Sequence, residues 1–214
     1  MGSAALSLAT ARAEVAAVTD SAAGSGAEPG PRPVTDSASA FAADFEELFA
    51  AVGSAALFRE GGPEHLTASC LVVDLDAEAV LLNHHRKAGL WGQFGGHVEA
   101  RDDSLRSAAC REALEESGLV SLSWFSPTAV DLHVHDLSQA FGRCSRHFDV
   151  VYAAGASVAE TPVVSAESVD VKWFPLTSLP AALMPDLVVR LPELYAAAFV
   201  AAELRSPGRT SPRH

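Results

Sequence analysis

Apolar positions recur with helical and strand-like periods over residues 41–205, which we interpret as the folded domain. In residues 44–52 they fall at every third or fourth position, the spacing of an amphipathic helix. Further helices are predicted over 104–117, where Gly118 provides a stop, and over 187–204. Apolar runs bounded by turn residues predict strands at 69–74, 79–83, 128–134, 147–153 and 169–174. Because these elements are mixed without regular alternation, we expect an α+β fold.

The segments outside this domain have a different composition. Residues 1–40 contain 12 alanines and a run of Ser, Gly and Pro typical of a linker, so we expect a disordered tail there. A polar tail is expected over 206–214. Residues 89–96 are too rich in glycine for a regular element and too apolar for a solvated loop.

Charge and composition exclude several classes of partner. Lys and Arg number 15 against 27 Asp and Glu, a formal net charge of −12, which disfavours binding to nucleic acid or anionic membranes. No apolar run approaches the roughly 20 residues that span a bilayer, and the N-terminal pattern does not fit a signal peptide. Three widely spaced cysteines suit a reducing compartment. We therefore expect a cytoplasmic protein with a small-molecule partner, and a homodimer is compatible with the sequence.

The chemistry is concentrated on the helix predicted over 104–117. Glu112, Glu115 and Glu116 share one face of it, and like charges at this spacing repel by a few tenths of a kcal/mol per pair. A divalent cation reverses that sign, because Mg²⁺ prefers carboxylate oxygens. A solvated acidic face is the alternative for such a triplet in isolation. Here Arg111 lies four residues before Glu115, placed to fix that side chain by a salt bridge, and Gly96 upstream would let the backbone approach a ligand or metal closely.

The segment from Gly96 to Leu119 resembles the Nudix box, G-x5-E-x7-R-E-U-x-E-E-x-G-U, in which U is apolar. Its second half agrees at every defined position: Arg111, Glu112, Ala113, Glu115, Glu116, Gly118 and Leu119. Its first half contains one extra residue, which we place in the loop before the helix. The acid of that half is an aspartate, either Asp102 or Asp103, instead of glutamate. The resemblance extends over roughly residues 65–182.

The resemblance implies an α/β/α sandwich with a mixed sheet and an enzyme that hydrolyses a diphosphate linkage in a nucleotide or nucleoside-diphosphate compound. In the family, water attacks phosphorus with the help of Mg²⁺, or of Mn²⁺ in its place. Glu115 would be a third metal ligand or the base that deprotonates water, and Arg111 would orient the glutamates. A base from a later loop is the alternative, with Glu167 the candidate and Asp170 in reserve. The implied metal ligands are Glu112, Glu116, Glu115 and the carbonyl of Gly96.

Substrate contacts are expected from aromatic and basic residues near the box. Trp91 and Phe94 could stack on a base, or could plug the core beneath the glycine-rich loop. Arg143 and Arg146 form the only basic pair of their loop and are candidate phosphate contacts.

A group of histidines suggests two different sites. His133, His135, Cys144 and His147 invite a zinc interpretation, but the spacing H-x-H-x8-C-x2-H matches no common structural zinc site. We favour instead a substrate pocket lined by these histidines, with His147 among the phosphate contacts.

Two functions compete with the hydrolase. Some Nudix domains only bind a ligand and regulate a partner, but those usually lose box carboxylates, and all three are present here. Isopentenyl diphosphate isomerases share the fold and use a reactive cysteine, but none of the three cysteines lies beside a glycine-rich pocket motif. A metal-dependent pyrophosphohydrolase therefore remains the leading interpretation.

Overall fold

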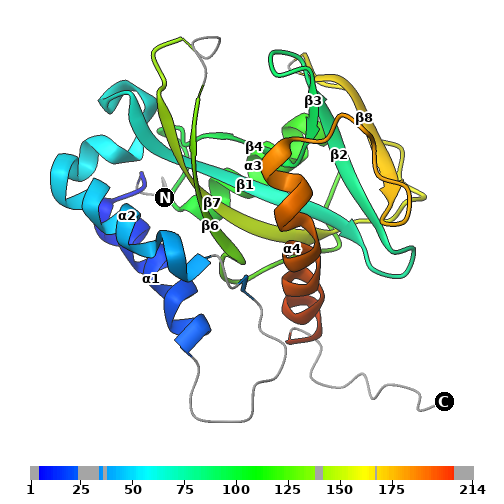
Figure 1. The fold of residues 1–214 in the computed structure, drawn as a ribbon, viewed down its shortest axis with the longest axis horizontal. Coiled ribbons are helices and arrows are strands. Elements are labelled where there is room, and N and C mark those ends of the chain that lie inside the picture. Colours follow the sequence, from blue (N-terminus) through cyan, green and yellow to red (C-terminus); the bar gives the residue numbers. More distant parts are fainter. Residues whose placement is uncertain (1–4, 24–33, 36–37, 138–141, 167, 205–214) are drawn as a thin grey trace.

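The computed structural model describes residues 5–23, 34–35, 38–137, 142–166 and 168–204 (Figure 1). The helices are α1 (Leu8–Ala23), α2 (Ala38–Val52), α3 (Leu105–Ser117) and α4 (Pro185–Leu204), with short 3-10 helices η1 (Gly53–Leu57) and η2 (Arg59–Gly61). The strands are β1 (Glu64–Asp74), β2 (Ala79–His85), β3 (Leu90–Gly92), β4 (Phe94–His97), β5 (Trp124–Phe125), β6 (Asp131–Asp136), β7 (Arg146–Gly155) and β8 (Ser168–Pro175).

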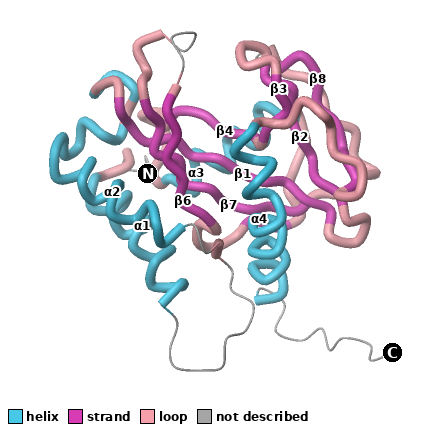
Figure 2. Tube along the Cα trace, in the orientation of Figure 1, coloured by secondary structure: helices cyan, strands magenta, loops and turns pink. Residues whose placement is uncertain are grey.

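Strand β1 organises a mixed sheet. One edge of β1 pairs in parallel with β7 over ten residues, from Glu64 opposite Arg146 to Val73 opposite Gly155. The other edge pairs antiparallel with β4 in its first half and with β2 in its second half. Strands β3 and β8 extend the sheet beyond β2, and β5 and β6 pair with β7. Because β4 and β2 share one edge of β1, the sheet divides at that point (Figure 2).

Helices cover both faces of this sheet. Side chains alternate along a strand, so Cys70 and Val72 of β1 face the core cluster that contains α1, α2 and α3, while Leu71 and Val73 face the cluster that contains α4. Figure 1 shows α4 crossing the sheet on the near side. This arrangement confirms the expected α+β fold with helices on both sides of a mixed sheet.

The structure departs from the expected N-terminal tail. Residues 8–23 form α1, and Ala11, Val15 and Val18 of that helix are buried against the main core. Their spacing of four and three residues is helical, but alanine and valine give it low contrast, which the composition of the segment obscured. Residues 1–4 and 24–33 and the tail expected over 206–214 lie outside the described residues. None of the helices that the structure describes is long and apolar enough to cross a membrane.

Helix α1 also reaches the N-terminus of α3. Glu14 accepts hydrogen bonds from the backbone N–H groups of Leu105, at 2.8 Å, and Arg106, at 3.0 Å, and from the hydroxyl of Tyr152, at 2.9 Å. The N–H groups of a first helical turn have no partner within their own helix. A side chain from the N-terminal segment therefore completes the first turn of α3.

The glycine-rich segment at 89–96 is regular, contrary to expectation. Residues 90–92 form β3 against β2, and residues 94–97 form β4 against β1. A Cβ on Gly95 would lie 2.8 Å from the Cα of Ser69, so close packing between strands, and not turn geometry, requires glycine there.

Candidate functional site

The carboxylates of the resemblance converge on one cavity. Glu112, Glu115 and Glu116 of α3 line a cavity of about 220 Å³ together with Gly96 of β4 and Arg111. His97, Glu99 and Ser165 complete its wall. The three glutamates differ in exposure: Glu116 is 5% exposed, whereas the Glu115 side chain is 49% exposed at the rim. The structure thus brings together every metal ligand that the resemblance implied.

Helix α3 is fixed at both ends. Ser104 is its N-cap, and the hydroxyl accepts a hydrogen bond from the N–H of Ser107 at 3.0 Å. Gly118 ends the helix in the left-handed conformation, with φ of 65°, and its N–H donates to the carbonyl of Leu114. The opposite face of the helix buries small apolar side chains, Leu105, Ala108, Ala109 and Ala113. These contacts hold the glutamates at a fixed distance from the sheet.

Glu116 is oriented by the sheet. Its Oε2 accepts hydrogen bonds from the backbone N–H of Gly95, at 3.0 Å, and from Nδ2 of Asn83, at 3.2 Å. Asn83 is 1% exposed and also donates to the carbonyl of Gln93. Asn83 was not among the predicted site residues, because no local pattern in the sequence links it to Glu116, 33 residues later.

Arg111 organises the acidic cluster. Its guanidinium donates to both carboxylate oxygens of Asp102, at 3.0 and 2.9 Å, to Glu112 at 2.8 Å and to Glu115 at 3.2 Å. It also donates to the carbonyl of His97 at 3.0 Å. Burial acts to lower the pKa of Arg111, but the hydrogen bonds to Asp102 and Glu112 outweigh it and raise that pKa. The guanidinium therefore stays charged and holds two glutamates in place.

The contacts of Arg111 distinguish the two candidate aspartates of the first half of the box. Asp102 is 4% exposed and receives the bidentate contact, while Asp103 is exposed and accepts a hydrogen bond from the hydroxyl of Ser104. With Asp102 as the acid, the spacing places the extra residue between Asp102 and Arg111.

The close approach of Gly96 to Glu112 shapes the cavity. A Cβ on Gly96 would lie 2.7 Å from Oε1 of Glu112, so only glycine fits between β4 and the carboxylate. A cavity lined by the carboxylates of Glu112, Glu115 and Glu116 has the ligand chemistry that Mg²⁺ and Mn²⁺ prefer. The residues present fit such an ion.

Comparison with known proteins agrees with this geometry. A family model described as the NUDIX domain matches residues 63–197, more than half of the chain. The chain belongs to the Nudix family. A MutT Nudix hydrolase from Burkholderia pseudomallei is 26% identical to this Nudix protein, over 61% of this chain and 98% of that chain, with a TM-score of 0.50. A Nudix-family hydrolase from Clostridium perfringens, 24% identical over 64% and 97% of the two chains with a TM-score of 0.51, shares the fold. A search of curated protein sequences found no match.

The two candidate aromatic contacts of this Nudix protein occupy different places. Phe94 is fully buried in the core beside α3, so it is a core residue, which was the alternative interpretation, and has no surface for stacking on a base. Trp91 is half-buried, stacks on His84 with ring centroids 5.1 Å apart and packs edge-on against Phe174. It does not line the cavity of the glutamates.

The basic candidates and the later acids lie apart from the carboxylates. Arg146 donates to Asp136 at 2.8 Å, and Arg143 is exposed in the connection before β7. Asp170 lies on β8 and forms an ion pair with Lys172. Glu167 lies outside the described residues. None of these described side chains lines the cavity.

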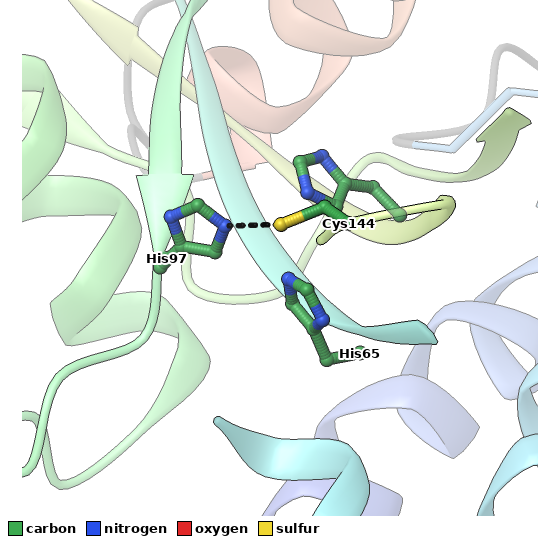
Figure 3. Close-up of side chains that lie close together, drawn as sticks. His65, His97 and Cys144 are labelled. Carbon is green, nitrogen blue, oxygen red and sulfur yellow. Dashed lines mark hydrogen bonds between the residues drawn. The ribbon is translucent and has the colours of Figure 1, made fainter. Parts of the chain in front are cut away.

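The histidines gather on the sheet face beside the cavity, but in a different set from the one the sequence suggested. His65, His97, Cys144 and His147 place their nitrogen and sulfur atoms within 4.8 Å of one another. Figure 3 shows the His97 ring and the Cys144 sulfur pointing toward each other, with His65 below them. The rings of His133 and His135 stack on each other next to this group. His65 and His97 could not be found from spacing, because strand pairing alone brings them to Cys144.

A buried acid lies on the same face. Asp149 of β7 is 4% exposed and accepts hydrogen bonds from Thr67, Ser69 and Gln93. The donor residues come from β1 and from the turn before β4, so the acid joins three parts of the sheet. Where α4 covers this face of the sheet, the side chains are apolar. Here Asp149 and its three donors, four polar residues, take their place.

Proposed function

We propose that this Nudix protein is a Mg²⁺- or Mn²⁺-dependent hydrolase that cleaves a diphosphate linkage in a nucleotide or nucleoside-diphosphate compound. The observation that carries the proposal is the convergence of Glu112, Glu115 and Glu116 on one cavity beside Gly96. Family membership supports the reaction class, and the arrangement of the carboxylates supports a retained active site.

The charge of the cavity explains the need for a cation. Its lining contains four carboxylates, including that of Glu99, against the guanidinium of Arg111. An anionic diphosphate would be repelled from such a wall. A bound divalent ion neutralises charge on the phosphate oxygens and lowers the pKa of its bound water. The small volume of about 220 Å³ suits a diphosphate group, so the remainder of the substrate would lie outside the cavity.

The glutamates of α3 and Arg111 then have separate tasks. Glu112 and Glu116 hold the cation with the carbonyl of Gly96, and the sheet fixes Glu116 through Gly95. Glu115, more exposed at the rim, is placed to take a proton from the attacking water or to serve as a further ligand. Arg111 positions Glu112 and Glu115 by direct hydrogen bonds.

The competing functions have less support in the structure. A ligand-binding module without activity would not need three carboxylates to be held in one cavity by this network. The isomerase chemistry needs a reactive thiol, but burial raises the pKa of Cys70 and of Cys110, which disfavours the thiolate. Cys144, the third cysteine, does not line the cavity of the glutamates.

The test is release of phosphate or pyrophosphate with Mg²⁺ and with Mn²⁺ across a substrate panel. The panel contains dNTPs, ADP-ribose, NADH, dinucleoside polyphosphates, nucleotide sugars and isopentenyl diphosphate. We expect metal-dependent turnover of one class, reduced by 10² or more in Glu116→Gln, about 2.7 kcal/mol of barrier. Glu46→Gln, on the exposed surface of α2, is the matched control and should retain full activity. Ligand-induced thermal stabilisation without turnover of any substrate would contradict the hydrolase and favour the binding module.

A further inference from the structure

A cluster of three histidines and one cysteine lies beside the carboxylate cavity, whose wall it shares through His97. His65 is the second residue of β1 and His147 the second of β7. His97 ends β4, and Cys144 precedes β7 in the connection from β6. In the sheet register His65 pairs with His147, while Thr67, two residues along β1, pairs with His97. Three adjacent strands thus present imidazoles to the same face of the sheet.

The rings are arranged as a tripod. The ring centroids of His65 and His97 are 5.1 Å apart, those of His65 and His147 are 5.1 Å apart, and those of His97 and His147 are 5.2 Å apart. Cys144 adds a sulfur atom 3.9 Å from Nε2 of His97 (Figure 3). Four ligand atoms from four positions in the sequence therefore surround one point.

The tripod is buried or half-buried, and two of its ring nitrogens have no hydrogen-bond partner among the described residues. His65 and Cys144 are buried, and His97 and His147 are half-buried. Nδ1 of His65 lies 2.9 Å from the carbonyl of Gly62, which assigns the ring proton to Nδ1 and leaves Nε2 as a free acceptor. Nε2 of His65 and Nε2 of His147 have no hydrogen-bond partner among the described residues. A metal-binding histidine commonly has this arrangement, with its other nitrogen donating to a carbonyl.

We propose that His65, His97, Cys144 and His147 bind a zinc ion in a closed tetrahedral site distinct from the carboxylate cavity. Nitrogen and sulfur ligands select zinc, whereas the oxygen ligands of the cavity select Mg²⁺ or Mn²⁺. The ligand atoms lie within 4.8 Å of one another. A zinc ion with bonds of about 2.0–2.3 Å places its ligands about 3.3–3.8 Å apart, so small side-chain rotations close the site.

This zinc ion has a structural role beside the cavity. It ties β1 and β4 to the connection before β7, and His97 lines the cavity of the glutamates. The carbonyl of His97 accepts a hydrogen bond from Arg111, which positions Glu112 and Glu115. The zinc ion therefore stabilises the wall on which the acidic cluster rests.

The first experiment measures the metal content of protein made without a histidine tag. After dialysis against metal-free buffer, we expect native mass spectrometry to show one zinc ion per chain, removed by EDTA and restored by zinc. Titration of the metal-free protein with Co²⁺ should give a thiolate-to-cobalt charge-transfer band and the visible bands of a tetrahedral site. The proposal is overturned if the wild-type protein retains no zinc and Co²⁺ gives no charge-transfer band. This result does not depend on whether the variants fold.

Variants assign the ligands. Cys144→Ser should abolish the charge-transfer band, and His147→Gln should weaken zinc binding at least tenfold. Cys110→Ser and His135→Gln are the matched controls and should retain one zinc ion per chain. Equal zinc binding by Cys144→Ser and wild type, or loss of the band in Cys110→Ser, overturns the ligand set.

A last variant separates the zinc site from the proposed hydrolase. Glu116→Gln should lose hydrolysis but keep both the zinc ion and the cobalt spectrum. If the wild type shows no hydrolysis but retains zinc, the proposed function fails and the zinc site stands. Loss of zinc in Glu116→Gln would contradict two distinct sites and overturn the proposal.

Discussion

The carboxylate of Glu14 caps the backbone N–H of Leu105, the first residue of α3, across 91 residues of sequence. The N-terminus of a helix carries a partial positive charge, and a carboxylate is favoured there. Ser104 satisfies the N–H of Ser107 in the same turn. Helix α1 lies outside the segment that matches the NUDIX family, yet it holds the helix that carries the acidic cluster. We infer that the N-terminal segment is part of the folded domain.

Replacing Glu14 should therefore weaken the fold. Glu14→Ala removes the acceptor for two backbone N–H groups and for the hydroxyl of Tyr152, and we expect the free energy of unfolding to fall by about 1–3 kcal/mol. Urea denaturation followed by circular dichroism measures the change. Glu46→Ala, which removes an exposed ion pair with Arg12, should cost about 0–1 kcal/mol. Equal urea midpoints for Glu14→Ala and Glu46→Ala would contradict a stabilising contact between Glu14 and α3.

Asp102 and Asp103 are adjacent acids with very different expected roles. Asp102→Asn removes the charge from the bidentate contact with Arg111, so we expect a loss of about 1–3 kcal/mol in unfolding free energy. Diphosphate hydrolysis should also fall, because Arg111 positions Glu112 and Glu115. Asp103→Asn changes an exposed residue and should leave both properties near wild type. Thermal denaturation and initial rates of the two variants check this prediction, and a larger defect in Asp103→Asn would refute the assignment.

Gly96 is predicted to be intolerant of any side chain. The Cβ of Gly96→Ala would lie 2.7 Å from Oε1 of Glu112, so the carboxylate must move out of position. We expect hydrolysis to fall by at least tenfold while the protein remains folded. Gly62→Ala is the control, since its Cβ would meet no atom closer than 3.9 Å. Initial rates at saturating metal compare the two, and full activity in Gly96→Ala would mean that Glu112 need not keep its position.

The sequence predicted those parts of the fold that depend on local pattern. Helix α3 was predicted over 104–117 with Gly118 as its stop, and its acidic triplet shares a face by helical geometry alone. Strands β1 and β7 follow from apolar runs, and α4 from a long apolar segment. Helix α1 was missed because small side chains bury little area and give a weak pattern, although they pack well against neighbouring helices.

The parts that escaped prediction depend on strand register between distant segments. Asn83 reaches Glu116 only because β2 and β4 share an edge of β1. Asp149 finds Ser69 through the parallel pairing of β1 and β7, across 80 residues. The zinc interpretation of the sequence used His133 and His135, which are near Cys144 in the chain. The pairing of β1 with β4 and β7 instead brings His65 and His97 close to Cys144.

His133 should make the stability of the protein sensitive to acid. The side chain is buried between Phe41 and the ring of His135. Burial, followed by the charge of Arg190, lowers the pKa of His133 below its ordinary value of 6.5, although Asp149 and Asp186 act in the opposite direction. Below pH 6.5 the unfolded chain therefore binds this proton more readily than the folded protein does. The contribution of His133 is complete above that pH and is lost as the pH falls toward its folded pKa.

The measurement is the free energy of unfolding from about pH 7.5 to about pH 5, in buffer with EDTA so that no bound metal contributes. Wild type should lose stability with decreasing pH more steeply than His133→Gln, because the variant lacks the group that takes up the proton on unfolding. The two curves should therefore converge as the pH falls. Parallel curves would mean that His133 takes up its proton equally in the folded and unfolded states, and that the charges of Asp149 and Asp186 offset burial completely.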